Sequence, residues 1–354
     1  MIKNITLQND IEQLLLDDNL DFQKFNNSTL FVTGATGLIG SLIIRYFLYI
    51  SEKLLLNIHV IGLARDINKS KEIYGTVLPN NVKLIFGDIT QNYETYLDTS
   101  LNIDYIFHTA SVTSSKEMII HPVLTIMTAV DGTNQMLRLA AEKNVKRMVY
   151  VSSMEMYGSF NSDDICDENK LGFIDPLAIR SNYPESKRLC ENLCVAYASE
   201  YNVRVKIARL SQTFGAGILP WENRIFAQFA RSVIEKKDIV LHTRGLSEGN
   251  YCYTSDTISG LLTILLNGTD KEAYNIVNEQ THTTILGMAQ MVCESIAHNE
   301  IKVVFDIPEN NIFGYAADTK LKLSGKKLEA LGWSANINLP EMYKRTISYL
   351  KQLN

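Results

Sequence analysis

Short apolar runs alternate along most of the chain with longer segments in which apolar residues recur every three or four positions. The short runs are nearly continuous, as in parallel strands buried on both faces, and the longer segments are typical of helices that cover a sheet. The expected strands span residues 30–33, 59–63, 83–86, 105–108, 148–152 and 205–209. This alternation predicts an α/β fold with a doubly wound parallel sheet.

After residue 209 the alternation loosens, and Gly215, Gly217 and Pro220 interrupt the chain. Beyond them we expect helices at 224–236, 253–266, 288–296 and 339–350, and strands at 239–242 and 273–277. We therefore expect a main domain and a smaller C-terminal lobe built from returning segments. The expected boundaries are 1–28 for an N-terminal extension, 29–210 for the main domain with 250–278 returning to it, and 211–249 with 279–354 for the lobe.

The composition of the 354 residues, 46% hydrophobic and 21% charged with a net charge of -5, provides enough apolar residues for a full core. An acidic balance disfavours a surface that binds nucleic acid or an anionic membrane. Residues 1–6 lack the apolar core of a signal peptide, and 43–50 are too few and carry a charge, so we expect no membrane span.

The five cysteines are odd in number and irregularly spaced, which suits a reducing compartment, and we expect a cytoplasmic protein. Cys190 and Cys194 have helical spacing and offer half of a metal site. Because no His or Cys pair nearby completes it, we expect two packed thiols and no metal.

A glycine-rich turn follows the first expected strand and precedes an apolar helix at 42–50. In this context glycines let the backbone approach a pyrophosphate, and the helix N-terminus offers free N–H groups. The turn therefore predicts a dinucleotide site, the alternative being a tight turn that binds nothing. Its expected cofactor-binding residues are Gly34, Thr36, Gly37, Leu38, Ile39 and Gly40.

The ends of the second and third strands bear on the type of cofactor. Ala64 stands where an acidic residue would bind the ribose of NAD, and Arg65 follows it, which favours the 2′-phosphate of NADP over NAD. Alternatively, Arg65 pairs with Asp66 and is uninformative. Asp88, followed by Ile89, is placed to meet the adenine amino group, although an Asp there also suits a simple turn.

Tyr183 and Lys187 lie four residues apart and share one face of an expected helix. A tyrosine has an ordinary pKa of about 10, which a nearby ammonium lowers, so the pair is suited to proton transfer. Ser153 ends the fifth strand and is expected to hydrogen-bond the substrate oxygen. Glu155 is either a base that removes a proton beside a transient ketone or an ordinary loop residue.

With these motifs the chain resembles the extended short-chain dehydrogenase/reductase family, the nucleotide-sugar epimerases, dehydratases and decarboxylases. The resemblance rests on Thr33–Gly40, Gly87–Ile89, Phe107–Ser111, Ser152–Gly158, Tyr183–Lys187, Tyr251–Asp256, Ala273–Ile276 and Leu331–Trp333. It implies a Rossmann main domain that binds the dinucleotide and a substrate-binding lobe. It also implies catalytic roles for Ser153, Tyr183 and Lys187, and it places Ala110 and Ser111 beside the nicotinamide ribose.

The same resemblance matches Glu155 to a glutamate of the 4,6-dehydratases and glucuronate decarboxylases. Met154 replaces an aspartic acid that protonates the leaving hydroxyl in one dehydratase branch. Gln212 stands where the phosphate-side motif that begins at Arg209 has asparagine, and Ala129 stands where a helix often has asparagine.

The arginine that clamps the substrate diphosphate in the family is Gly249 here. Its candidate replacements are Arg224, Arg231 and Arg244, and we expect Gln212 and Arg224 to bind substrate.

The leading functional hypothesis is an NAD(P)-dependent enzyme that acts on a nucleotide-linked sugar through a transient 4-keto sugar. The alternative is an NADPH-dependent reductase of a keto-sugar or sugar phosphate, which Arg65 and Gly249 favour. A third hypothesis is a non-catalytic cofactor-binding protein. The resemblance further suggests a homodimer through the helices that contain 134–143 and 183–200.

Overall fold

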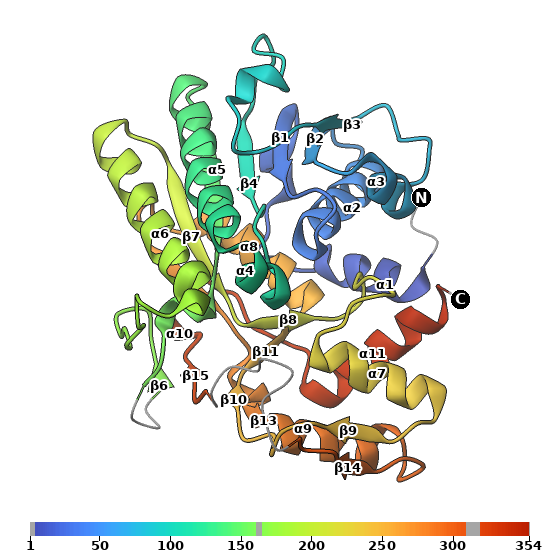
Figure 1. Cartoon of the computed structure of the whole chain (residues 1–354). Coiled ribbons are helices and arrows are strands. Elements are labelled where there is room, and N and C mark those ends of the chain that lie inside the picture. Colours follow the sequence, from blue (N-terminus) through green and yellow to red (C-terminus); the bar gives the residue numbers. More distant parts are fainter. Residues whose placement is uncertain (1–3, 161–164, 309–318, 354) are drawn as a thin grey trace.

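The computed structural model describes residues 4–160, 165–308 and 319–353. Its main sheet has seven parallel strands in the order β3-β2-β1-β4-β5-β7-β12 (Figure 1). The strands are β1 (Ser28–Thr33), β2 (Ile58–Ala64), β3 (Val82–Phe86), β4 (Tyr105–His108), β5 (Arg147–Ser153), β7 (Val205–Leu210) and β12 (Ala273–Ile276). The order reverses between β1 and β4, so this is a doubly wound Rossmann sheet and the predicted fold class is confirmed.

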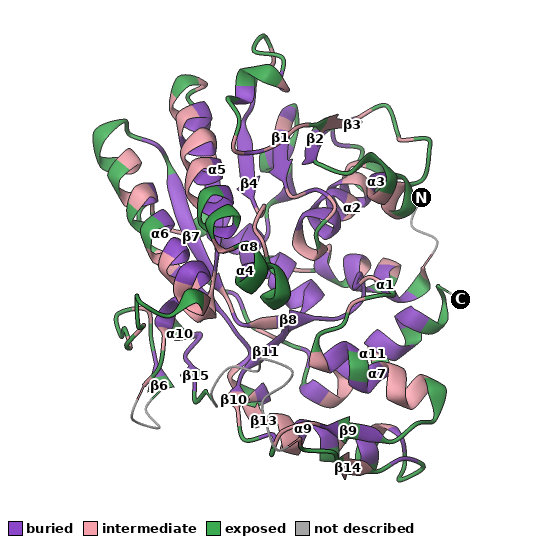
Figure 2. Ribbon diagram, in the orientation of Figure 1, coloured by how far each residue is buried: buried purple, intermediate pink, exposed green. Residues whose placement is uncertain are grey.

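Helices cover both faces of the sheet, which explains why its strands are apolar without alternation. Leu30 and Val32 of β1 face one core together with α2 and α8, whereas Phe31 faces the other with α5 and α6. In Figure 2 the inner strands of the sheet are buried, the edge strand β3 is partly exposed, and the long helices α5 and α6 are exposed on their outer sides. The helices of this domain are α2 (Leu38–Lys53), α3 (Ile67–Tyr74), α4 (Ser115–Ile120), α5 (Pro122–Glu142), α6 (Asn182–Glu200) and α8 (Thr254–Asn267).

The C-terminal lobe lies at the carboxyl ends of the strands, in the lower part of Figure 1. Its helices are α7 (Ile225–Glu235), α9 (Ile285–Met291), α10 (Lys326–Glu329) and α11 (Leu339–Lys351). Short paired strands complete it: β6 (Ile165–Cys166) with β15 (Lys322–Leu323), β8 (Gln212–Phe214) with β11 (Tyr251–Tyr253), β9 (Ile239–Leu241) with β14 (Val303–Phe305), and β10 (Glu248–Gly249) with β13 (Thr283–Thr284). One apolar core runs from the main sheet into this lobe.

The N-terminal segment packs onto the C-terminal end of the chain. Its helix α1 (Ile5–Leu14) carries Asp10, which accepts hydrogen bonds from Arg345 at 2.9 Å and from the Tyr253 hydroxyl at 2.8 Å. A polar hollow of about 280 Å³ lies beside it, lined in part by Asp10 and Asp256. Asp256 accepts backbone hydrogen bonds from Asn336 and Ile337, so both buried carboxylates have partners.

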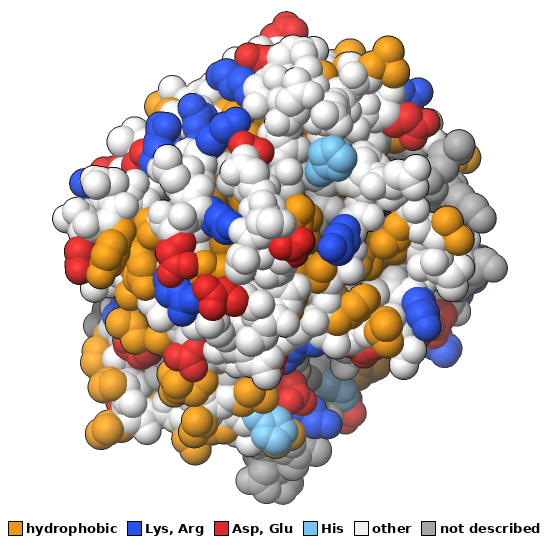
Figure 3. All heavy atoms as spheres, turned by 90° about the horizontal axis from the view of Figure 1, so that it is seen from above, with side chains coloured by type: hydrophobic (Ala, Val, Ile, Leu, Met, Phe, Trp, Pro, Cys, Tyr) orange, Lys and Arg blue, Asp and Glu red, His pale blue; other side chains and the backbone are white. Residues whose placement is uncertain are grey.

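Lysine or arginine and aspartate or glutamate side chains intermingle on the face at the amino ends of the strands (Figure 3). This mixture agrees with the near balance of the two charge signs in the sequence. Among the described residues, no helix is both long and apolar enough to cross a membrane.

The predicted elements differ from the structure mainly in the lobe. Tyr253 ends β11, where it pairs with Phe214 of β8, and its extended backbone makes it the N-cap of α8 and not the first residue of the helix expected at 253–266. The helix expected at 288–296 begins earlier, at Ile285, and its second half is a π-helical turn at Val292–Ile296. The two- and three-residue strands of the lobe are too short to give a periodic signal, apart from β9.

Candidate active site

The predicted functional groups lie at one edge of the sheet. The glycine turn follows β1, Ala110 and Ser111 follow β4, and Ser153 ends β5. These three strands are adjacent and parallel, so their carboxyl ends meet at the same edge. Such an edge, at the reversal of strand order, is where doubly wound sheets bind ligands.

The glycine turn is shaped by close backbone contacts. Gly34 has φ of +66°, and the Gly37 N–H donates to the Gly34 carbonyl at 2.8 Å. A Cβ on Gly40 would lie 2.3 Å from the Gly34 carbonyl oxygen, so only glycine fits. Gly37 precedes α2 and no side chain caps the helix, which leaves its first N–H groups for a ligand. Thr36, Leu38 and Ile39 around this turn are half-buried.

The residues that bear on the adenosine half of the cofactor have simpler local roles. Arg65 is exposed, while the Asp66 carboxylate accepts backbone hydrogen bonds from Asn68 and Lys69 and so caps α3. A pairing of Arg65 with Asp66, the alternative interpretation, would thus compete with the capping of α3 by the same Asp66 carboxylate. Asp88 accepts hydrogen bonds from the backbone and hydroxyl of Thr90, both at 2.9 Å, as a turn residue does.

Lys187 is buried beneath Tyr183 on α6. Its ammonium donates to the Val151 carbonyl at 2.9 Å and lies 4.9 Å from the centre of the Tyr150 ring and 5.6 Å from that of the Tyr183 ring. Burial lowers the pKa of Lys187 to about 8, so the side chain keeps its charge at neutral pH. The structure therefore brings the predicted Tyr/Lys pair together, with a positive charge close to the phenol.

The environment of Tyr183 contains opposing influences. Burial raises the pKa of the Tyr183 phenol, and the Glu155 charge raises it further. The hydroxyls of Ser153 and Ser111 and the charge of Arg180 lower it. Ser153 thus lies beside the phenol, and its contact with a substrate oxygen stays a prediction.

The Ser111 hydroxyl is the clearest sign that the site is built for a ligand. It is buried and near Tyr183, yet it has no hydrogen-bond partner of good geometry. Buried polar atoms normally have a partner in the protein, in water or in a ligand, so an unpaired hydroxyl at the ligand-binding edge of the sheet is compatible with a bound group. Together with the glycine cradle, this orphan hydroxyl fits a nicotinamide dinucleotide whose ribose hydroxyls supply the missing partner.

Glu155 lies on a short 3-10 helix, Met154–Tyr157, directly after Ser153. Its backbone N–H donates to the Ser153 hydroxyl at 3.2 Å. Its carboxylate pairs with Arg180 at 2.9 Å, from the 3-10 helix Ile179–Ser181 that leads into α6. Glu155 is therefore an ordered carboxylate beside Tyr183, and Arg180 is a neighbour that sequence reasoning missed.

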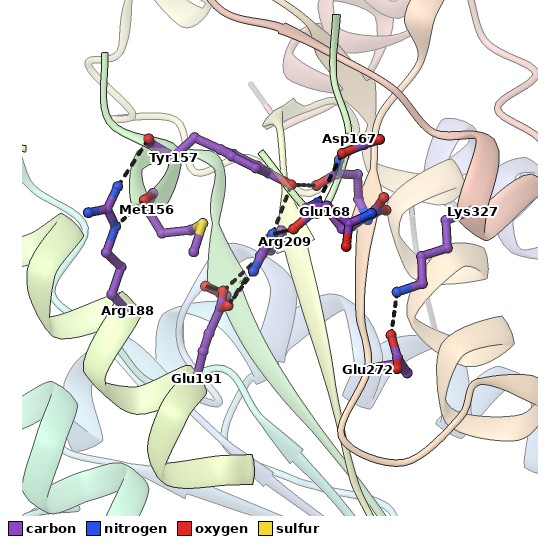
Figure 4. Close-up of polar contacts among 12 residues, drawn as sticks. Met156, Tyr157, Asp167, Glu168, Arg188, Glu191, Arg209, Glu272 and Lys327 are labelled. Atoms are coloured by element: carbon purple, nitrogen blue, oxygen red, sulfur yellow. Dashed lines mark hydrogen bonds and ion pairs between the residues drawn. The ribbon is translucent and has the colours of Figure 1, made fainter. Parts of the chain in front are cut away.

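Arg188 holds the segment that carries Glu155 (Figure 4). Its guanidinium donates to the carbonyls of Met156 at 2.7 Å, Tyr157 at 3.1 Å and Gly172 at 2.8 Å. Arg188 follows Lys187 on α6, so one helix supplies the Tyr/Lys pair and anchors the neighbouring loop. The position of Arg188 next to Lys187 was the one hint in the sequence that it has a role near the site. The carbonyl groups that it contacts could not be predicted from the sequence.

Comparison with known proteins settles the family. A model of the NAD dependent epimerase/dehydratase family matches residues 30–277. The chain belongs to this family. Its enzyme class and the predicted family resemblance are thereby confirmed, and the cofactor named for the family is NAD.

Sequence relatives agree with this assignment, and a solved structure shares the fold. UDP-glucuronic acid decarboxylase 1 of Danio rerio is 25% identical over 328 residues, which cover 91% of this chain and 72% of that protein. The dTDP-D-glucose 4,6-dehydratase of Bos taurus is 25% identical over 331 residues, 91% of this chain and 88% of that one. The structure of dTDP-glucose 4,6-dehydratase from Streptomyces venezuelae, with NAD bound, has a TM-score of 0.74 and 23% identity over 92% of this chain and 97% of its own.

The family is described as NAD dependent, so membership of it does not support the preference for NADP that Arg65 suggested. Arg65 is exposed at the end of β2, and no charged side chain of the described residues is recorded in contact with it. An exposed arginine beside a strand end is compatible with either dinucleotide, so Arg65 does not decide between NAD and NADP.

Arg209, which opens the phosphate-side motif, is committed to the protein itself (Figure 4). It is buried and pairs with Glu191 at 2.7 Å, while it donates to the Tyr157 hydroxyl at 3.0 Å and the Glu168 carbonyl at 2.9 Å. Ser152 also donates to Glu191, at 2.6 Å. This network joins β5, β7 and α6, and it leaves Ser153 as the serine that lies beside Tyr183.

The predicted substrate residues are only partly free to bind. Gln212 begins β8 and is half-buried. Arg224 is exposed, pairs with Glu222 at 2.7 Å and lies over the Phe226 ring at 4.8 Å. Arg231 donates to the Glu222 carbonyl. Two of the three candidate replacements for the clamping arginine therefore already have partners.

Gly249 leaves real space where the family has arginine. A Cβ built there meets no atom within 4 Å. Arg244, the third candidate, is exposed in the loop between β9 and β10, the strand that ends at Gly249.

All five cysteines are buried thiols, and within the described residues none of them forms a disulfide bond. Within the ranges that the structure describes, no group of three or more His, Cys, Asp and Glu is arranged to hold a metal ion.

Proposed function

We propose that this enzyme oxidises a nucleotide-linked sugar at C4, rearranges the resulting keto sugar and then reduces it again. The observation that carries this proposal is the meeting of Ser153, Tyr183 and Lys187 with a second acid–base group, Glu155, at the sheet edge where the glycine turn lies. Simple alcohol–ketone exchange needs only the first three residues. The relatives named above act on UDP-glucuronic acid and dTDP-D-glucose, which supports a nucleotide-linked substrate.

The chain's own residues divide the work between them. NAD, when bound, accepts a hydride and later returns it. Tyr183 takes the proton of the sugar hydroxyl and gives it back, while the buried Lys187 ammonium and the Ser153 hydroxyl stabilise the charge on the two oxygens. Glu155 removes or receives a proton at the carbon next to the ketone.

NAD is the cofactor that we propose, through Gly34, Gly37, Gly40 and the orphan Ser111 hydroxyl. A direct test is calorimetric titration of the cofactor-free enzyme with NAD and with NADP. We expect NAD to bind at least tenfold more tightly, and a preference for NADP would restore the role first inferred for Arg65.

The catalytic proposal is tested by single-turnover spectroscopy of the NAD-loaded enzyme with UDP-glucuronate and dTDP-glucose. We expect the wild type to reduce and reoxidise its nicotinamide with no net loss of NAD. Tyr183→Phe should slow the reduction by about 10² to 10⁴-fold, the usual worth of an acid–base group. Glu155→Gln should reduce the nicotinamide and then accumulate it in that form. Full turnover by Glu155→Gln would contradict a role as base.

An NADPH-dependent reductase is the second candidate, because Gly249 removes the diphosphate clamp and two candidate replacements are already paired. Such an enzyme consumes its cofactor one for one with product. A steady fall in nicotinamide absorbance with a keto-sugar, and none of the cyclic behaviour with nucleotide sugars, would favour it over the leading proposal.

We also propose a homodimer that pairs α5 and α6 of two copies. Val123, Leu124 and Met127 of α5 and Leu189 of α6 are exposed apolar residues on these neighbouring helices. Exposed apolar residues grouped in this way are typical of an interface. Sedimentation velocity should give a dimer that Met127→Asp weakens, and a monomeric wild type would exclude the proposal.

A further inference from the structure

Arg180 connects two groups of the site. It lies three residues before Tyr183, in the 3-10 helix that leads into α6, and its guanidinium is 2.9 Å from the Glu155 carboxylate. Both side chains are about one-third exposed. The pair therefore borders the place where a substrate would meet Tyr183.

We propose that Arg180 is a positioning residue that fixes the Glu155 carboxylate and neutralises its charge beside Tyr183. The proposal rests on the proposed function, in which both of these groups exchange protons. It adds a residue that neither the motifs nor the family membership identifies.

The backbone and the side chain of Glu155 are held by different means. The backbone N–H is bound to Ser153, and Arg188 anchors the next two carbonyls of the turn. The carboxylate, by contrast, has Arg180 as its ionic partner. Loss of Arg180 should therefore free the carboxylate without releasing the turn, because the backbone contacts remain.

The charges around Tyr183 give the direction of the effect. Glu155 and Arg180 act on the phenol from the two 3-10 helices, Ser153 and Tyr150 face it from β5, Ser111 from the loop after β4, and Lys187 from α6. Glu155 raises the pKa of Tyr183 and Arg180 lowers it. Without Arg180 the carboxylate has one opposing charge fewer, so the phenol should ionise at higher pH.

Arginine suits this position better than lysine for a geometric reason. A guanidinium presents donors in a planar fork, and here one nitrogen bonds Glu155 while the rest of the fork remains available to a substrate oxygen. A lysine would keep the charge but hold the carboxylate less firmly. Arg180→Lys should thus restore the ionisation of Tyr183 better than it restores the rate of the Glu155-dependent step.

The test measures ionisation of Tyr183 without any sugar. Tyrosinate absorbance is titrated against pH in NAD-loaded protein. From the titration of each variant we subtract that of the same variant carrying Tyr183→Phe, so that the difference reports Tyr183 alone. We expect Arg180→Gln to move the midpoint to higher pH, Arg180→Lys to restore most of that shift, and Glu155→Gln to move the midpoint to lower pH. Arg204→Gln is the control, because it also removes a partly exposed arginine from an ion pair, here with Asp270. Arg204 directly precedes β7, at the amino ends of the strands and away from the site, so this variant should leave the midpoint unchanged.

Two results would overturn the proposal. One is an Arg180→Gln midpoint that equals that of the Arg204→Gln control. The other is a double variant, Glu155→Gln with Arg180→Gln, whose midpoint shifts upward as far as that of Arg180→Gln alone, since Arg180 would then act without Glu155. If Arg180→Gln does not fold, Arg180→Lys and Glu155→Gln still decide the question by the direction of their shifts. Because no sugar is used, failure of the proposed reaction leaves this test intact.

Discussion

At the scale of one residue, Lys187 shows how a group that the proposed reaction needs can lower the stability of the fold. The ammonium is 3% exposed, and its recorded hydrogen bond is to a neutral carbonyl, that of Val151. Removing a charge from water in this way is costly, which is why burial lowers the pKa of Lys187 to about 8. The same charge is what Tyr183 needs beside it.

Lys187→Met should therefore abolish cofactor reduction and yet stabilise the fold. At pH 7 we expect the free energy of unfolding to rise by about 1–3 kcal/mol, because the buried charge is gone. An unfolded lysine keeps its proton up to about pH 10, whereas the folded Lys187 loses it near 8. The wild type thus gains stability with rising pH in that interval, and the advantage of the variant should shrink.

Chemical denaturation at pH 7 and pH 9.5 measures both effects. Lys206→Met is the matched control, since Lys206 is as buried but is paired with Asp270. It should destabilise the protein, because Asp270 loses a partner. Equal losses of stability for the two variants at pH 7 would contradict the cost assigned to Lys187.

Spacing within one helix or at one strand end was sufficient to predict Tyr183, Lys187 and Ser153 as neighbours. A helix fixes the geometry of residues four apart whatever surrounds it. Arg180 and Arg188 escaped notice because their partners lie about 25 to 32 residues away, on a turn whose course depends on the tertiary fold. The same holds for Arg209, whose buried pairing with Glu191 joins a strand to a helix.

At the scale of elements, the long strands were predictable and the short ones were not. The strands expected at 30–33, 59–63, 83–86, 105–108, 148–152 and 205–209 fall within β1, β2, β3, β4, β5 and β7. These strands lie in the sheet that helices cover on both faces, so their apolar runs are strong signals. Strands such as β10 and β13 have two residues each, and their pairing is set by the loops that bring them together.

The contact between the glycine turn and α2 gives a prediction at this scale. Gly40→Ala places a Cβ 2.3 Å from the Gly34 carbonyl oxygen, with backbone on both sides of the clash. The turn and the helix must move apart, so we expect affinity for NAD to fall at least tenfold and the melting temperature to fall as well. Differential scanning fluorimetry with and without NAD measures both.

Gly249→Ala is the matched control for this substitution, because its Cβ meets no atom within 4 Å and its φ is not positive. It should leave the melting temperature and the response to NAD close to wild type. If Gly40→Ala also left the melting temperature and the response to NAD close to wild type, the close contact between Gly40 and the Gly34 carbonyl would not constrain the turn as we infer.

At the scale of the whole molecule, the parts of the chain are joined by one core. Apolar residues of α1, the main sheet, α8 and α11 belong to the same buried cluster, so the N-terminal segment and the lobe are not separate units. The division at 29–210 that was drawn from the sequence remains a prediction, since a shared core sets no boundary. Buried polar groups such as Asp10 and Asp256 lie where these parts meet.

Asp256 makes the stability of the whole molecule depend on pH. It is 5% exposed at the start of α8, and burial raises its pKa from the ordinary 3.8 to about 6, although the N–H groups of Asn336 and Ile337 oppose the shift. Between these two values the folded carboxyl holds a proton that the unfolded chain has lost. Asp256 therefore contributes stability below pH 4 that is lost as the pH rises through 6.

Asp256→Asn keeps an oxygen for both backbone N–H groups and removes the titration. The difference in unfolding free energy, wild type minus variant, should fall by up to about 3 kcal/mol between pH 4 and pH 7, a shift of about two pKa units at about 1.4 kcal/mol each. Urea denaturation at several pH values measures it, with Asp98→Asn as a control, because Asp98 is exposed and its pKa is lowered by Ser100. That control should show the opposite slope, since a lowered pKa stabilises the ionised folded form. A pH-independent difference for Asp256→Asn would mean that the backbone N–H groups offset the burial of its charge.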